Sequence, residues 1–100
     1  MRESSLLKRI QIAASRAGAR LFRNNVGFDA ERRVHYGLCR GSSDLIGWTP
    51  IEIREEHIGS VVAVFTAVEC KSKRGRLTEE QQRFLDAVRT AGGIAREERE

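Results

Sequence analysis

Cysteine, proline and long apolar runs are scarce in this 100-residue sequence, which has two cysteines and one proline. Cys39 and Cys70 are too few for a disulfide framework, and neither forms a CxxC motif or a ligand cluster with a histidine. The longest wholly apolar run, residues 61–65, is far shorter than the roughly 20 residues that cross a membrane. No signal-peptide pattern opens the chain. We therefore expect a reduced, soluble, cytoplasmic protein with no membrane partner.

Acidic residues are in the minority, because 18 Lys and Arg stand against 14 Asp and Glu, for a net charge of +4. Fifteen of the 18 basic residues are Arg, whose planar fork binds phosphate in a bidentate manner. The net charge is +6 over residues 1–40, −4 over residues 41–70 and +2 over residues 71–100. An acidic centre that would collect a metal is thus flanked by basic segments that would collect phosphate. Taken alone, this distribution is more typical of an ordinary solvated surface.

The hydrophobic pattern predicts two helices in a chain long enough for one domain, residues 1–100, with a modest core. Apolar residues recur at helical spacing over residues 3–17, and Gly18 would end that helix. A second helix is predicted over residues 78–91, with Gly92 and Gly93 at its end. In this helix Phe84, Leu85 and Val88 would face inward.

Strand patterns lie between and after the helices. They cover residues 19–25, 44–53, 60–72 and 94–96, with a short extended piece at 33–36. Residues 61–65 are apolar on both faces, as in a central strand. Periodicity alone therefore predicts an α/β or α+β domain.

Two carboxylates and one lysine occupy positions that can meet on adjacent strands. Glu69 and Lys71 are separated by one residue, so on an extended strand both project to one face and Cys70 to the other. Asp44 opens the apolar run 45–48 and can meet them if the two runs pair. This constellation is typical of a metal-dependent nuclease.

The chemistry explains the residue types. Hydrolysis of a phosphodiester needs hard oxygen ligands for Mg²⁺ or Mn²⁺, and the carboxylates of Asp44 and Glu69 fit that role. The backbone carbonyl of Cys70 is a further candidate ligand, whereas its side chain is predicted to lie in the core. Lys71 would orient or help to deprotonate the attacking water, or counter charge on the phosphate.

Four ordered blocks resemble the virus-type replication-repair nuclease (VRR-NUC) family from about residue 3 to residue 94. They are RNNVG at 23–27, GSSDLIG at 41–47, ECK at 69–71, and GRLTEEQ at 75–81 with AGG at 91–93. Asp44 and the 69–71 block are also similar to the PD-(D/E)XK nuclease motif, although its proline is missing. The resemblance implies a restriction-endonuclease-like core in the order α-β-β-β-α-β, with a mixed sheet flanked by helices.

The resemblance adds Glu3 and Gln81 to the candidate site. Family members carry a glutamate at the start of the first helix that contributes to the metal site, although any acid there also favours the helix dipole. They also have a glutamine that borders the active site, at the position of Gln81. The same glutamine completes a capping box with Thr78, and Gln82 is the neighbouring candidate if the register is shifted by one.

Candidate DNA contacts lie before Asp44 and after Lys71. The asparagines after Arg23 are typical of a turn, but the resemblance places Arg23 and Asn24 near the scissile phosphate. The basic run after Lys71 would be a solvated turn or, as we expect, a contact with the DNA backbone. The candidate DNA-binding residues are Arg23, Asn24, Ser43, Lys73, Arg74 and Arg76.

These observations predict a Mg²⁺- or Mn²⁺-dependent, structure-specific DNA endonuclease. Standalone, phage-type members of the family resemble Holliday-junction resolvases, and symmetric cutting of a four-way junction needs a two-fold homodimer. One alternative is a flap-directed or sequence-specific nuclease of the same superfamily. Another is a non-catalytic DNA-binding module, against which the clustered acids argue, because a mere binder gains nothing from carboxylates facing phosphate.

Overall fold

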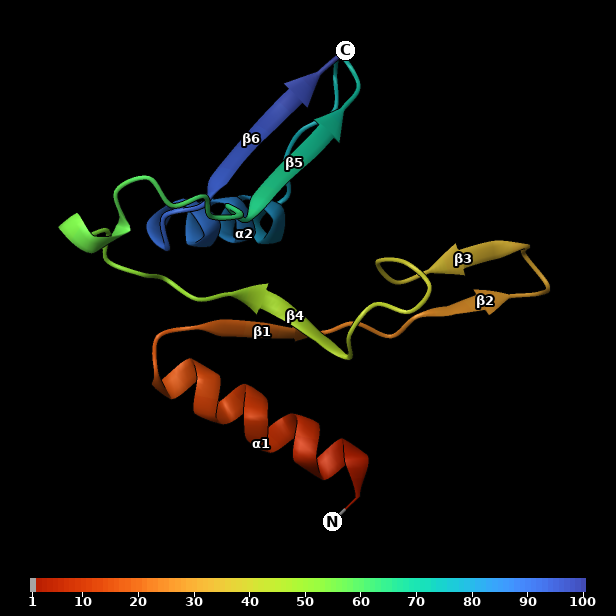
Figure 1. Cartoon of the computed structure of the whole chain (residues 1–100). Helices are drawn as coiled ribbons and strands as arrows, with labels where there is room; N and C mark the ends of the chain where they lie inside the picture. Colours follow the sequence, from red (N-terminus) through yellow and green to blue (C-terminus); the bar gives the residue numbers. More distant parts are fainter. Residues whose placement is uncertain (1) are drawn as a thin grey trace. The chain divides into compact units, whose positions relative to one another are not determined.

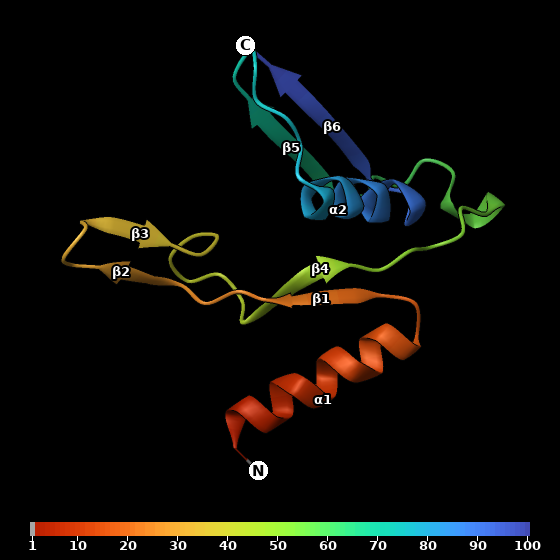
Figure 2. The same cartoon turned by 180° about the vertical axis from the view of Figure 1, so that it is seen from behind.

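The computed structural model describes residues 2–100 (Figure 1, Figure 2). The chain forms two compact units, one that ends at Thr49 and one that begins at Pro50. The first unit contains α1 (Glu3–Arg16), β1 (Arg20–Arg23), β2 (Gly27–Asp29), β3 (Val34–Tyr36) and β4 (Leu45–Trp48). The second contains a short 3-10 helix, η1 (Glu55–His57), then β5 (Thr66–Lys71), α2 (Glu79–Thr90) and β6 (Ile94–Arg99). Within residues 2–100 no helix combines the length and apolar character needed to cross a membrane.

The first helix matches its prediction almost residue for residue, because its end signal is local. α1 ends at Arg16, and Gly18 takes a φ of +91°, the left-handed conformation that glycine adopts most readily. The N–H of Gly18 donates to the Ser15 carbonyl at 3.2 Å and that of Ala19 to the Ala14 carbonyl at 2.9 Å. This Schellman motif satisfies carbonyls at the helix end and turns the chain toward β1.

β1 and β4 form an antiparallel pair in which Leu21 lies opposite Gly47 and Arg23 opposite Leu45. Figures 1 and 2 show α1 running beside this pair, and the Gln11 side chain donates to the Leu21 carbonyl at 3.1 Å. A Cβ atom at position 47 would lie 1.8 Å from the Arg20 carbonyl oxygen, so the pairing requires glycine there. Both strands are shorter than predicted, because each extends only as far as its four-residue partner.

β2 and β3 form an antiparallel hairpin, with Phe28 opposite His35 and their ring centroids 4.7 Å apart. β3 confirms the extended piece predicted at 33–36. β2 was not expected from the sequence, since three residues are too few to show a period of two. The Asp29 carboxylate accepts hydrogen bonds from the N–H groups of Glu31 and Arg32 at the turn, at 3.1 and 3.2 Å.

The second unit is a parallel β5–β6 pair connected through α2, as a parallel pair requires a crossover. Leu85 and Val88 are 3% and 1% exposed and form its core, as predicted. Phe84 was wrongly predicted to face inward, since it is 40% exposed. The last strand extends to Arg99, beyond the predicted residue 96, because it pairs with β5 along its whole length.

Residues 60–65 do not continue β5, so the prediction of one strand over 60–72 is wrong in its first half. Their side chains are exposed apart from Phe65, and Val61 is 97% exposed. The cause is the length of the partner: β6 begins at Ile94, which pairs with Thr66, so the residues before Thr66 have no β6 residue opposite them. Apolar sequence without a ladder partner does not make a strand.

Residues 2–100 thus form a small mixed α/β structure whose strands pair as β1–β4, β2–β3 and β5–β6. The helices and strands agree with the expected α/β class, but the element order differs from the predicted α-β-β-β-α-β, because five strands and not three lie between α1 and α2. The predicted single mixed sheet is not confirmed, since each of the three pairs stands as its own sheet. The predicted pairing of the strand after Asp44 with the strand that carries Glu69 would join the two units, and it stays a prediction.

Candidate functional site

Glu69 and Lys71 share one face of β5, as the alternation of side chains requires. The Lys71 Nζ lies 3.8 Å from Glu69 Oε2, and the two side chains are 18% and 32% exposed. Cys70 lies on the other face and is exposed, so the expectation that its side chain belongs to the core is wrong. Val68, on the same face, is also 43% exposed, so this face of β5 is open and does not form a core.

Two further charged residues join this face from β6. The parallel register places Glu97 beside Glu69 and Arg99 beside Lys71, so their side chains lie on the same side of the sheet. The Arg99 Nη2 forms an ion pair with Glu97 Oε1. Neither residue was among the sequence candidates. Each lies 28 positions after its partner on β5, and no local pattern shows that the two strands pair in this register.

The backbone carbonyl of Cys70 points away from β6. The carbonyl oxygens of Phe65 and Lys71 accept hydrogen bonds from the N–H groups of Ile94 and Glu100, at 2.9 and 3.1 Å. In a parallel ladder alternate carbonyls of one strand point to the partner, so Cys70, between Glu69 and Lys71, presents its carbonyl to the opposite edge of β5. An oxygen at that edge beside the Glu69 carboxylate suits a hard cation.

The basic loop, residues 72–76, follows β5 directly. It is a turn in which the Gly75 N–H donates to the Ser72 carbonyl at 3.2 Å. Lys73, Arg74 and Arg76 are exposed, and no carboxylate of the described residues 50–100 is in ion-pair contact with them. Three cations without a carboxylate partner can therefore meet phosphate next to Lys71.

Asp44 is exposed and lies in the bend directly before β4. Its carbonyl oxygen accepts a hydrogen bond from the N–H of Asn24 at 2.8 Å. The Asn24 side chain donates to Ser42 Oγ at 2.7 Å and to the Ser43 carbonyl at 2.9 Å, and it accepts from the Leu38 N–H at 2.9 Å. Asn24 thus holds both ends of the 38–44 loop. The sequence had suggested for Asn24 only a turn or a substrate contact.

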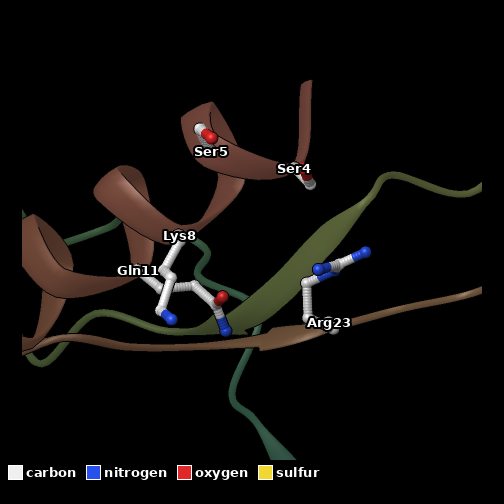
Figure 3. A pocket seen from close by; sticks show the side chains of 5 residues that line it. All are labelled: Ser4, Ser5, Lys8, Gln11 and Arg23. Carbon is white, nitrogen blue, oxygen red and sulfur yellow. The ribbon is translucent and has the colours of Figure 1, made fainter. Parts of the chain in front are cut away.

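Arg23, next to that network, also lines a hollow of about 410 Å³ between α1 and β1. Figure 3 shows Lys8 and Gln11 reaching from α1 toward β1, with Arg23 extending from the strand and Ser4 and Ser5 on the first turn of the helix. Two cations and two hydroxyl groups in one hollow suit a phosphate group. This supports the expected role of Arg23 and adds Lys8, which was not among the sequence candidates.

Glu3 and Gln81 occupy helix starts, as predicted. Glu3 is exposed in the first turn of α1, where the helix dipole favours an acid. The Thr78 side chain accepts from the Gln81 N–H at 3.1 Å, and Gln81 Oε1 accepts from the Thr78 N–H at 3.0 Å, so the predicted capping box is confirmed. Gln82 instead donates to Asp86 at 2.9 Å. A role of Glu3 or Gln81 at the active site stays a prediction.

A metal site within a single unit is absent from the described residues. Neither residues 2–49 nor residues 50–100 bring together three or more His, Cys, Asp or Glu side chains that could hold a metal ion. The predicted ligand set takes Asp44 from one unit and Glu69 with the Cys70 carbonyl from the other, and it stays a prediction. All of these donors are oxygens, which is the chemistry that Mg²⁺ and Mn²⁺ prefer.

The family model described as VRR-NUC domain matches residues 4–97, nearly the whole chain. No curated protein and no solved structure matches the sequence.

Proposed function

The chain belongs to the VRR-NUC family of PD-(D/E)XK-type nucleases, and on this premise we propose that it is a metal-dependent, structure-specific DNA endonuclease. We place Holliday-junction resolution first among its activities. The reaction is the hydrolysis of a phosphodiester bond, and residues 1–100 act as one nuclease domain.

The observation that carries the proposal is the arrangement at the end of β5. The Glu69 carboxylate lies 3.8 Å from the Lys71 ammonium group, on one face, with the Cys70 carbonyl at the strand edge between them. Together with Asp44 these oxygens would hold Mg²⁺ or Mn²⁺, which supplies an acidified water and neutralises charge on the phosphate. Lys71 then holds the attacking water or the phosphate oxygen, and Gln81 and Glu3 border the site.

DNA contacts flank these residues in both units. Lys73, Arg74 and Arg76 follow Lys71 in the basic loop, and we assign them to the phosphate backbone of the strand being cut. Arg23, in the hollow beside α1, and Ser43, in the loop before β4, are assigned to the same strand near Asp44. Asn24 acts by holding that loop in place.

Paired incision of a four-way junction needs two active sites on opposite strands. A two-fold homodimer of this chain would supply them and double the DNA-binding surface. We therefore propose that the active form on DNA is a homodimer, and that linear duplex is a poor substrate.

The test is cleavage of linear duplex, single strand, flap, splayed arm and mobile four-way junction, each with Mg²⁺, with Mn²⁺ and with EDTA. Paired nicks in the junction, absent in EDTA, are expected. Light scattering should give twice the 11.3 kDa mass of one chain for the free protein, and that mass plus the mass of the junction for the complex. Full cleavage in EDTA would reject the metal mechanism. A monomer on DNA that prefers flaps would reject the resolvase, and no cleavage of any substrate despite tight binding would favour the non-catalytic module.

A further inference from the structure

Arg99 binds the basic loop from the neighbouring strand. Its Nη1 donates hydrogen bonds to the carbonyl oxygens of Ser72 at 3.0 Å and Lys73 at 3.3 Å, and also to that of Gly75. One guanidinium nitrogen thus gathers three carbonyls of a turn that lies 24 to 27 residues earlier in the chain. These contacts span the segment that carries the cations proposed to meet DNA.

The second end of the guanidinium is held as well. The Arg99 Nη2 pairs with Glu97, so the planar fork is fixed between its own strand and the loop. The two side chains are 39% and 30% exposed, so this ion pair is shielded more than a typical surface pair. An ammonium group has a single nitrogen and cannot reproduce this two-sided geometry.

The loop in turn rests against Lys71. A Cβ atom built on Gly75 would lie 3.5 Å from Lys71 Cδ, and the N–H of Glu100 donates to the Lys71 carbonyl at 3.1 Å. Arg99 also lies beside Lys71 in the parallel register. The C-terminal end of β6 therefore borders both the basic loop and Lys71.

We propose that Arg99 is a positioning residue that holds the basic loop, residues 72–76, in the conformation that presents Lys73, Arg74 and Arg76 to DNA. Arg99 acts through its hydrogen bonds to the loop and not through contact with phosphate. What the loop does rests on the proposed nuclease function. The set of hydrogen bonds from Arg99 to the loop, which we call the clamp, is a property of the folded chain itself. The two are therefore tested separately.

The first experiment uses no DNA. Trypsin cuts after Lys73, Arg74 and Arg76, and cleavage requires the loop to open, so its rate in the full chain reports how firmly the loop is held. Trypsin should cut Arg99→Gln and Arg99→Lys at these sites at least about fivefold faster than it cuts wild type, which corresponds to a loss of about 1 kcal/mol of local stability. The matched control is Arg96→Gln, which removes an arginine of the same strand that pairs with Glu98 at 3.0 Å on the opposite face. Trypsin should cut this variant at the wild-type rate.

Thermal unfolding separates a local effect from a failure to fold. The clamp is supported if Arg99→Lys unfolds at the wild-type temperature and still loses protection in the loop. It is overturned if Arg99→Lys and Arg99→Gln are cut at these sites no faster than wild type. Faster cutting spread over the whole chain would also overturn it, because Arg99 would then support the fold in general.

The second experiment measures binding of the four-way junction in EDTA. A positioning role predicts that Arg99→Lys weakens binding about as much as Arg99→Gln, since retaining the charge does not restore the loop. A direct phosphate contact predicts that Arg99→Lys binds nearly as well as wild type, and that result would overturn the proposal. If wild type itself binds no DNA, the proposed function fails, while the trypsin result still decides the clamp.

Discussion

The main-chain N–H of Asn24 and the carbonyl oxygen of Asp44 are 2.8 Å apart, so a candidate metal ligand is anchored by the residue that follows β1. The Asn24 side chain adds three hydrogen bonds to the 38–44 loop. The main chain from which the Asp44 side chain extends is therefore held by a neutral residue.

Replacing Asn24 by Ala should impair this loop without removing any charge. It removes the hydrogen bonds to the Leu38 N–H and the Ser43 carbonyl, both exposed, at a cost of about 0.5–1.5 kcal/mol in stability. Cleavage should fall through kcat, because Asp44 is displaced. Calorimetric unfolding and steady-state kinetics check this, with Asn25→Ala, an exposed neighbour, as the control. Wild-type kcat in Asn24→Ala would show that the network does not position Asp44.

Variants of Asp44 and Glu69 should differ from a variant of Lys71 in how they affect metal binding. Asp44→Asn, Glu69→Gln and Lys71→Ala should each abolish cleavage and leave DNA binding largely intact. Titration calorimetry with Mn²⁺ should show weaker binding for the two acid variants and not for Lys71→Ala.

The control for this series is Asp86→Asn, which removes an exposed carboxylate that pairs with Arg89 on α2. It should cleave as wild type does. Undiminished turnover by Asp44→Asn would remove that residue from the metal site.

Salt dependence should report the basic loop. Replacing Arg74 and Arg76 by Ala removes two cations, so the slope of log K against log salt should become shallower by about two. Base preference should not change. The matched control replaces Arg54 and Arg83, which already pair with Glu52 at 3.0 Å and Glu79 at 3.4 Å, and should keep the wild-type slope. Equal slopes for both double variants would mean that the loop does not contact the backbone.

Gly47→Ala should disrupt the β1–β4 pair. The added Cβ has no room beside the Arg20 carbonyl, so the strands must separate, at about 1–3 kcal/mol. The midpoint of thermal unfolding should fall by roughly 4–8 °C for each kcal/mol lost. Circular dichroism measures it, and Thr49→Ala, an exposed residue just after β4, is the control. An unchanged midpoint would mean that this close approach does not persist in solution.

Gln81 can be tested for its two roles at once. Gln81→Glu keeps the capping box, because Glu serves equally at this position, but it adds a negative charge. If Gln81 borders the active site, cleavage should fall at least about tenfold, or about 1.4 kcal/mol, with no loss of helix stability. Normal turnover would leave Gln81 as a cap only. A loss of activity in Gln82→Ala instead would identify its neighbour as the active-site glutamine.

Helices were predicted well because their signals are local. The 3.6-residue period, Gly18, and the pair of Thr78 and Gln81 act within a few residues, so α1 and α2 begin and end close to the predicted positions. The alternation that places Glu69 and Lys71 on one face of β5 is local in the same sense.

Strand lengths were predicted poorly because a strand is defined by its partner. Residues 61–65 have high strand propensity but no β6 residue opposite them, and β4 ends at Trp48, opposite Arg20, the first residue of β1. Phe84 likewise fits the apolar pattern of α2 and is still 40% exposed, because the elements packed on a helix decide which part of its apolar stripe is covered.

The sequence by itself determined the family, the two helices and the residue types of the candidate site, since these depend on composition, spacing and short-range periodicity. Only the tertiary structure decided that Asn24 holds the loop before Asp44, and that Glu97 and Arg99 stand beside Glu69 and Lys71. These relationships join residues about 20 to 30 positions apart. They follow from strand register and loop closure, which no local pattern encodes.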